Sequence, residues 1–285
     1  MPNLREVQIT SIRDLTLPDE IFNSPNIEIL NLRDNKLTSI STKIGNLKNL
    51  KYLNLNNNNL SELPKSIGNL RNLKELNLSK NKGIASIPSQ FGNLKNLEIL
   101  IMDSLSMTKF PKCITKLRNL TEINMESNKT QSIPVEIENL TNLKTLNLSY
   151  NQIKSIPGEI ENLSNLEVLH LGGNKLKSLP EEIENLSNLK VLYLFNNLLE
   201  SIPEEIGNLD NLEELYLHNN RLKSLPDEIG NLQKLKIIYL LKNNNLTNIP
   251  CTLKNLKNLE TLKIPYDLNK VPGCLNDIKN KMKTY

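Results

Sequence analysis

The sequence predicts an α/β solenoid, in which one short structural repeat recurs along the chain. The repeat is 23 residues long, because the first leucine of successive repeats is found at Leu143, Leu166, Leu189, Leu212 and Leu235. Each repeat carries leucines at alternate positions, then an asparagine, then a proline. Fixed periods of about 20–29 residues are typical of solenoids, whose repeats contact only their neighbours.

The alternating leucines of each repeat predict a short strand. Leu192 and Leu194 are expected to point into the core and Tyr193 outward, because successive side chains of a strand lie on opposite faces. Strands of successive repeats are expected to pair in parallel, about 4.8 Å apart. We therefore expect one parallel sheet, with columns of outward side chains that run from repeat to repeat.

The asparagine after each strand is expected to lie inside the turn, where its amide satisfies buried backbone groups that the sheet does not reach. These asparagines are Asn35, Asn58, Asn81, Asn128, Asn151, Asn174, Asn197, Asn220 and Asn244. Leu105 replaces the asparagine in one repeat, and two repeats gain a residue, near Gly83 and near Asn243. The proline that follows, with Ile or Leu at a spacing of three, predicts an outer wall of short helical or 3₁₀ segments.

The repeats extend through the whole chain, so we predict a single solenoid domain over residues 1–285. Residues 1–26 form a degenerate first repeat, which is typical of an N-terminal cap. Residues 27–258 hold ten repeats, and residues 259–285 end early and form a C-terminal cap.

These repeats resemble the typical 23-residue class of leucine-rich repeats, with the pattern L-x-x-L-x-L-x-x-N-x-L and the wall variant I-P-x-x-I-x-N-L-x-N-L. That variant is found in bacterial proteins, notably those of spirochaetes, and in a related group of scaffold proteins. The resemblance covers essentially the whole chain. It implies a right-handed horseshoe with a parallel β-sheet on the concave face and short helical or 3₁₀ segments on the convex wall. It also implies a binding module without catalysis of its own, whose concave face binds proteins.

Composition excludes several classes of function. Acidic and basic residues are interleaved and the net charge is +4, which argues against a nucleic-acid surface. No apolar run approaches the roughly 18 residues of a membrane helix, so we expect no membrane insertion. The N-terminus shows no signal peptide. We expect a cytoplasmic protein if Met1 is the native start, and a secreted or cell-surface protein if a leader was removed.

The outward columns change character along the chain. They are small and polar in the first half, whereas aromatic side chains gather from Tyr150 onward. Exposed Tyr and Phe offer large contact area at low conformational cost, and exposed apolar patches mark interaction sites. Ring stacking between neighbouring strands is the alternative explanation, but it does not explain why the rings share one half of one face. We predict a partner-binding surface of Tyr150, His170, Tyr193, Phe195, Tyr216, His218, Tyr239, Leu241 and Tyr266.

The predicted function is non-enzymatic binding of a protein or peptide on the C-terminal half of the concave face. The resemblance adds a bacterial host-interaction or adhesion role. Glycan binding by the same aromatic surface is the alternative, because aromatic rings stack on sugars and the asparagine-rich half offers amides. We expect a monomer, with self-association through the apolar patch as a third hypothesis, and no cofactor.

Neither a metal site nor a catalytic site is predicted. His170 and His218 lie two repeats apart in different columns, so their Cα atoms should be about 10 Å apart, too far for one zinc ion. No cysteine or carboxylate cluster joins them, and no Ser/His/Asp or paired-carboxylate arrangement is evident. A histidine in the binding surface would still titrate near neutral pH and could act as a switch.

Cys251 and Cys274 lie on adjacent repeats near the C-terminal cap. Measured from the wall prolines, they are one position out of register. A capping disulfide is conceivable in an exported protein, but the outer wall is expected to be splayed. We therefore favour unpaired thiols.

Overall fold

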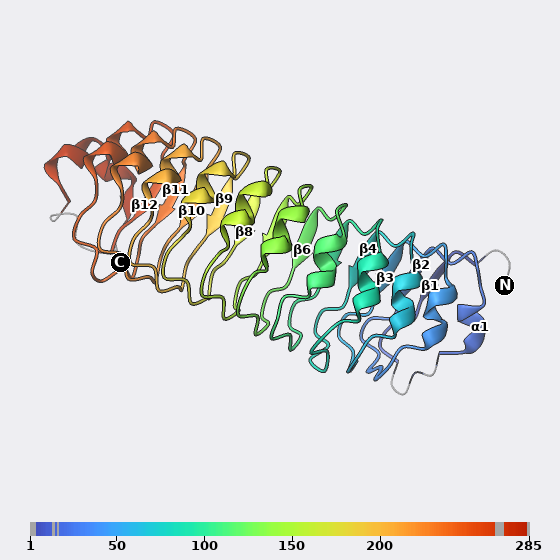
Figure 1. The fold of residues 1–285 in the computed structure, drawn as a ribbon. Helices are drawn as coiled ribbons and strands as arrows, with labels where there is room; N and C mark the ends of the chain where they lie inside the picture. Colours follow the sequence, from blue (N-terminus) through green and yellow to red (C-terminus); the bar gives the residue numbers. More distant parts are fainter. Residues whose placement is uncertain (1–3, 13–14, 16, 266–270, 284–285) are drawn as a thin grey trace. The chain divides into compact units, whose positions relative to one another are not determined.

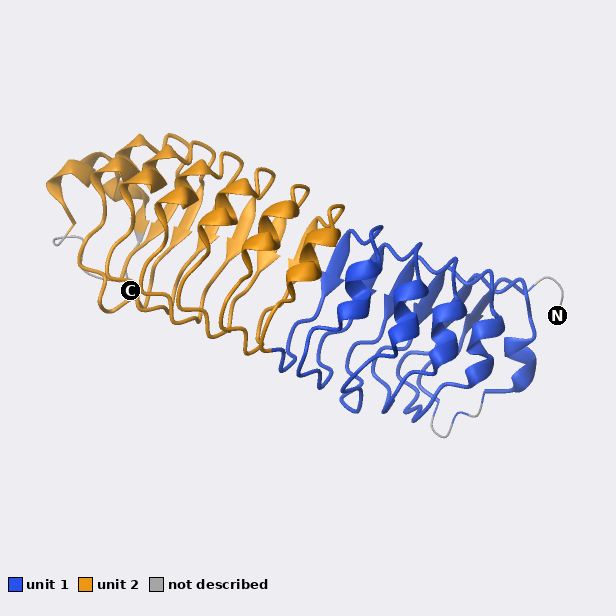
Figure 2. Ribbon diagram, in the orientation of Figure 1, with its two compact units in different colours: residues 1–130 blue, residues 131–285 orange. Residues whose placement is uncertain are grey.

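The computed structural model describes residues 4–12, 15, 17–265 and 271–283. The chain divides into two compact units, residues 1–130 and residues 131–285, which are described separately here (Figure 2). Each repeat forms one coil, with a short strand on one side and a 3₁₀ helix on the other (Figure 1). In the described residues, no helix has the length and apolar character needed to cross a bilayer.

The first unit contains six parallel strands in chain order. They are β1 (Glu6–Gln8), β2 (Ile29–Asn31), β3 (Tyr52–Asn54), β4 (Glu75–Asn77), β5 (Ile99–Ile101) and β6 (Glu122–Asn124). Its helices are α1 (Asp19–Phe22), η1 (Thr42–Asn46), η2 (Lys65–Asn69), η3 (Ser89–Asn93) and η4 (Lys112–Lys116).

The second unit repeats this arrangement, with parallel pairing from β7 to β13. Its strands are β7 (Thr145–Asn147), β8 (Val168–His170), β9 (Val191–Tyr193), β10 (Glu214–Tyr216), β11 (Ile237–Tyr239), β12 (Thr261–Lys263) and β13 (Met282–Lys283). Its helices are η5 (Val135–Asn139), η6 (Gly158–Asn162), η7 (Glu181–Asn185), η8 (Glu204–Asn208), η9 (Asp227–Asn231), η10 (Cys251–Asn255) and η12 (Gly273–Lys281).

The predicted repeat fold is confirmed. Leu192 and Leu194 are fully buried, whereas Tyr193 between them faces outward. The wall proline begins each typical 3₁₀ helix, since its fixed φ suits the position before the first turn and its carbonyl accepts the first hydrogen bond. In η2, for example, the amide of Ile67 donates to the carbonyl of Pro64 at 3.0 Å.

Each strand from β2 to β11 is followed by a residue in the left-handed conformation, directly before the asparagine position. These residues, all with φ between 54° and 69°, are Asp34, Asn57, Lys80, Ser104, Ser127, Tyr150, Gly173, Asn196, Asn219 and Lys242. Left-handed φ is unfavourable for most side chains, so the surrounding contacts must hold it. One such contact is the hydrogen bond from the amide of Asn196 to the carbonyl of His218 in the next coil, at 3.0 Å.

The asparagine ladder forms as predicted, with one correction. In a typical coil, the side-chain NH₂ group of the asparagine donates to one carbonyl of its own coil and to one of the preceding coil. Its side-chain oxygen accepts a hydrogen bond from a backbone amide of the preceding coil. Asn243, not Asn244, holds the last ladder position: it is 1% exposed and donates to the carbonyl of Leu217 at 3.0 Å. The added residue of that coil therefore lies after the ladder position. The predicted register placed it before that position, so the predicted ladder asparagine was one residue too late.

The two coils with an added residue close the turn differently. In a typical coil, the backbone amide two residues after the ladder asparagine donates to the side-chain oxygen of the asparagine in the next coil. Ile84 instead donates its backbone amide to the backbone carbonyl of Asn81 in its own coil, at 3.0 Å. Leu246 donates in the same way to the carbonyl of Asn243, at 3.0 Å. The next coil after Ile84 is the one in which Leu105 replaces the ladder asparagine, and Leu105 is simply buried.

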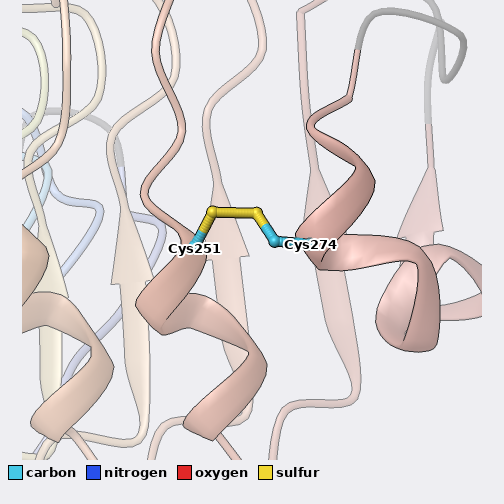
Figure 3. The surroundings of a disulfide bond; sticks show 2 residues. All are labelled: Cys251 and Cys274. Atoms are coloured by element: carbon cyan, nitrogen blue, oxygen red, sulfur yellow. A yellow bond between two sulfur atoms is a disulfide. The ribbon is translucent and has the colours of Figure 1, made fainter.

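The expectation of unpaired thiols near the C-terminal cap is wrong. Cys251 begins η10 and Cys274 lies in the first turn of η12, and the two form a disulfide (Figure 3). They are 23 residues apart, one repeat, so they occupy equivalent positions and their Cα atoms are 5.7 Å apart, within the normal range for disulfides. Measuring from the prolines was misleading because Pro272 stands one position early. Cys113 is free.

Candidate functional site

The first outward column of the second unit is a continuous stack of side chains. The last residues of β8 to β12 are in register across the sheet: His170, Tyr193, Tyr216, Tyr239 and Lys263. The rings of His170, Tyr193 and Tyr216 stack in parallel, with centroids 4.4 and 4.6 Å apart, close to the spacing of the strands. Tyr239 meets Tyr216 edge-on at 4.9 Å, and the ammonium of Lys263 lies 4.3 Å from the centre of the Tyr239 ring.

A second column lies beside the first, two residues further along each coil. The rings of Phe195 and His218 are parallel and 5.0 Å apart. Edge contacts join the columns, between Tyr193 and Phe195 at 6.3 Å and between Tyr216 and His218 at 6.5 Å. The rings therefore form one network, in which each ring limits the movement of the others.

Two consecutive glycines form the floor under two of these rings. A Cβ atom on Gly172 would lie 2.5 Å from Cζ of Phe195, and a Cβ atom on Gly173 would lie 2.6 Å from Cδ1 of Tyr150. The rings of Tyr150 and Phe195 meet edge-on at 6.1 Å over this floor. The absence of side chains on both glycines is therefore what lets the two rings lie against the backbone.

Replacing Gly172 by alanine is expected to displace the Phe195 ring from its stack on His218. The new methyl group overlaps the ring, and because Phe195 is only half-buried it can rotate away, at a cost of about 1 kcal/mol of stability. NMR signals of the His218 imidazole report the change in ring current. Gly273→Ala is the control, because nothing lies within 4 Å of its new Cβ. An unchanged His218 signal in Gly172→Ala would contradict this arrangement.

Hydrogen bonding fixes one tyrosine of the first column. The hydroxyl of Tyr216 donates to Oε2 of Glu214 at 2.8 Å, on the same strand. Burial, the bond to Glu214 and the negative charge of that carboxylate raise the pKa of Tyr216 well above its usual value. Burial and the same carboxylate also raise the pKa of Tyr193, so both hydroxyls remain neutral hydrogen-bonding groups at physiological pH.

His218 lies in the second column, between Phe195 and Leu241, and two lysines act on it. Burial lowers the pKa of its imidazole, and the positive charges of Lys242 and Lys263 lower it further. Its Nδ1 atom is buried and has no hydrogen-bond partner among the described residues. His218 is therefore neutral at pH 7, and its buried Nδ1 atom has an unused hydrogen-bonding capacity.

Most of the predicted surface residues come together, with two qualifications. Six rings from His170 to Tyr239 belong to the stacked network, and half-buried Leu241 continues the second column. Tyr150 lies in the left-handed turn after β7, not on a strand, and its side chain is 49% exposed. Tyr266 lies outside the described residues. We call the described members, Tyr150, His170, Tyr193, Phe195, Tyr216, His218, Tyr239 and Leu241, the aromatic surface.

Sequence reasoning missed three contributors to this surface. Lys263 has the register of the first column, since it follows Tyr239 by one coil, but it was not counted among the predicted binding residues. The sequence did not indicate a role for Gly172 and Gly173, because glycine is required there only by the positions of the neighbouring rings. Among the described residues, no group of three or more His, Cys, Asp or Glu side chains is placed to hold a metal ion.

The chain matches a family model described as a leucine-rich repeat region, over residues 4–151, 132–219 and 182–280. No curated protein matches it. Among solved structures, it is similar to a leucine-rich repeat protein of Leptospira interrogans, with 30% identity, a TM-score of 0.65, and coverage of 99% of this chain and 90% of that one.

Two further structures extend the comparison. The leucine-rich repeat ectodomain of the Arabidopsis thaliana receptor kinase GASSHO1/SCHENGEN3, solved with Casparian strip integrity factor 2, shares 32% identity at a TM-score of 0.78. The match covers 99% of this chain but only 38% of that ectodomain. An internalin of Listeria monocytogenes shares 21% identity at a TM-score of 0.73, covering 99% of this chain and 86% of that one, which shows likeness of fold alone.

Proposed function

Because this chain belongs to the leucine-rich repeat family, we propose that it is a non-enzymatic interaction module that binds a protein or peptide on the outward sheet face of residues 131–285. The observation that carries the proposal is the aromatic surface, with its rings held in one network. Rigid aromatic side chains with polar tips are the residues that most often dominate binding energy. The Arabidopsis receptor, whose structure contains a bound factor, supports a protein or peptide as the ligand.

The way the rings stack favours a peptide over a glycan. Sugars bind aromatic side chains through the ring faces, but the faces of Tyr193 are covered by His170 and Tyr216, at 4.4 and 4.6 Å. What the first column offers to a ligand is ring edges and tyrosine hydroxyls, which suit side chains and backbone groups of a peptide. Glycan binding remains the alternative, and a glycan array tests it.

A bacterial setting outside the cytoplasm fits two observations. The likeness to the Leptospira protein covers nearly the full length of both chains. The Cys251–Cys274 disulfide supports an oxidising compartment, because cytosolic thiols are kept reduced. We therefore propose that the partner is a protein met at or beyond the cell surface, as in host interaction or adhesion. We further propose that the protein is a monomer, which concentration-dependent sedimentation checks.

Replacing Tyr193, Tyr216 and Tyr239 together by alanine is expected to abolish partner binding while the fold is kept. Truncation of an anchor residue in an interface typically weakens binding by about 2 kcal/mol or more. Partners captured from extracellular material are identified by mass spectrometry, and their affinity for each protein is measured. Circular dichroism verifies that the variant is folded.

Tyr52→Ala is the control for this variant. Tyr52 is also a tyrosine with a partly exposed side chain, 42% accessible, but it lies in the first unit. The control should bind as the wild type does. A folded triple variant with unchanged affinity would overturn the proposed function.

A further inference from the structure

An open pocket lies beside the aromatic surface, at the ends of β10, β11 and β12. Its volume is about 620 Å³, within the range of ligand-binding pockets. Its polar lining consists of His218, Lys242, Asn196, Asn219 and Asn244. We call it the edge pocket, because it begins where the second column of the aromatic surface ends.

The floor of the edge pocket is apolar. Leu241, Ile264 and Pro265 complete its lining. Half-buried Leu241 and Pro265 form its accessible apolar surface, whereas Ile264 is fully buried. The pocket therefore presents polar groups and an apolar surface to the same occupant. Such a combination suits a side chain with a charged end and a hydrocarbon stem, or two neighbouring side chains of a peptide.

The polar groups of the pocket have unused hydrogen-bonding capacity. Nδ1 of His218 has no partner, and Lys242 forms no ion pair with a described carboxylate. Asn219 donates to Oδ1 of Asn196 at 2.6 Å, which orients the Asn196 amide and leaves its nitrogen as a donor without a partner among the described residues. An ammonium group, an imidazole and an amide nitrogen thus converge on one space.

The charge around this space is positive. Lys242 and Lys263 both act on His218, while the other groups packed against the imidazole, the rings of Phe195, Tyr216 and Tyr239, are uncharged. Glu214, on the same strand as Tyr216, accepts a hydrogen bond from the hydroxyl of that tyrosine. No carboxylate among the described residues forms an ion pair with Lys242, so a negatively charged group in the pocket would gain attraction to its ammonium.

We propose that the edge pocket is a subsite for an acidic side chain of the peptide ligand, with Lys242, His218 and Asn196 binding the carboxylate and Leu241 and Pro265 contacting its stem or an apolar neighbour. The proposal rests on the proposed peptide binding and adds the chemistry of one ligand residue. It fits the geometry because a peptide lying along the ring edges of the second column reaches the pocket directly.

The subsite makes binding dependent on pH. A carboxylate beside His218 favours the charged imidazole, so ligand binding raises the pKa of His218 from its lowered value. By linkage, affinity for an acidic peptide increases as pH falls through that pKa. Affinity for an uncharged peptide should not increase in this way.

The test uses two peptides of equal size, acetyl-Leu-Glu-Leu-amide and acetyl-Leu-Gln-Leu-amide. The chain has only two histidines, so the imidazole NMR signals of His218 and His170 are assigned with single His→Gln variants. The glutamate peptide is expected to shift the His218 signals to saturation and to raise the titration midpoint of His218. The glutamine peptide is expected to bind at least about tenfold more weakly, since hydrogen bonds to charged groups contribute about 1.5–3 kcal/mol.

Lys242→Gln is expected to weaken binding of the glutamate peptide about tenfold, the effect of losing one charge-assisted contact. Lys80→Gln is the matched control, because Lys80 occupies the same turn position in the first unit with φ of 58°, against 57° for Lys242. Equal binding of the two peptides, no effect of Lys242→Gln, or no His218 shift up to the solubility limit of the glutamate peptide would each overturn the subsite.

The two proposals fail in distinguishable ways. If the tyrosine variant loses its partner but the glutamate peptide leaves His218 unshifted, the aromatic surface binds and the subsite is wrong. If the glutamate peptide binds at His218 while the tyrosine variant keeps full affinity for its partner, the proposed function fails and the edge pocket stands as an anion site.

Discussion

Asn174→Asp is expected to destabilise the second unit by about 3 kcal/mol or more, because it removes donors from buried acceptors. The Asn174 amide nitrogen lies 2.9 Å from the carbonyl oxygen of Leu148, 3.0 Å from that of Leu171 and 3.4 Å from that of Gly172. Its oxygen accepts the amide of Ile153 at 3.0 Å. An ionised carboxylate can still accept, but it faces three carbonyl oxygens with no hydrogen to donate.

The loss of stability in Asn174→Asp should be larger at neutral pH than at acid pH. Only the protonated carboxyl can donate to a carbonyl, so folding favours the neutral form and stability falls as pH rises through the carboxyl titration. Denaturant unfolding at several pH values measures this. Asn54→Asp is the control, because Asn54 uses its side-chain oxygen as an acceptor, for the amide of Asn56 at 3.0 Å. Equal, pH-independent losses in both variants would show that the ladder does not depend on donation.

Removing the disulfide is expected to destabilise the C-terminal coils by about 3 kcal/mol, because the crosslink limits the freedom of the unfolded loop. The loop spans 23 residues of sequence between Cys251 and Cys274. In a solenoid the loss falls on the coils next to the crosslink, since each coil contacts only its neighbours. The double variant Cys251→Ser with Cys274→Ser should therefore open locally at η10 and η12.

Hydrogen exchange measured by mass spectrometry locates this effect. Protection should fall in residues 235–265 and 271–283 and remain unchanged in the first unit. Cys113→Ser is the control, because Cys113 is free and half-buried on η4. Uniform loss of protection through both units would mean that the crosslink stabilises the protein globally, contrary to the expected local role.

The repeat pattern predicts most of the fold, because each coil is decided by residues within it and its neighbours. Leu192 must be buried and Tyr193 exposed once the strand is recognised, and the ladder follows from the asparagine spacing. The errors arose where the count of residues changed. An added residue placed Asn243 and not Asn244 in the ladder, and an early proline hid the equivalence of Cys251 and Cys274.

The columns of the aromatic surface could also be predicted, because they depend only on register. Their side-chain arrangement could not. The parallel stacks, the floor at Gly172 and Gly173, and the edge pocket depend on ring orientations that no periodic pattern records. Tyr150 contacts the ring of Phe195, but its place in a left-handed turn follows from the backbone and not from strand alternation.

The coils of irregular length tolerate a substitution that the regular coils do not. In the 24-residue coil that begins at Leu73, the amide of Ile84 already has an acceptor in Asn81, so the following coil can carry Leu105 without leaving a buried amide unpaired. Without the added residue, loss of the asparagine would leave a buried amide unpaired at a cost of about 1–3 kcal/mol. The added residue near Gly83 and the leucine at position 105 are therefore compatible in energetic terms, whereas the same leucine in a regular repeat would leave a buried amide without an acceptor.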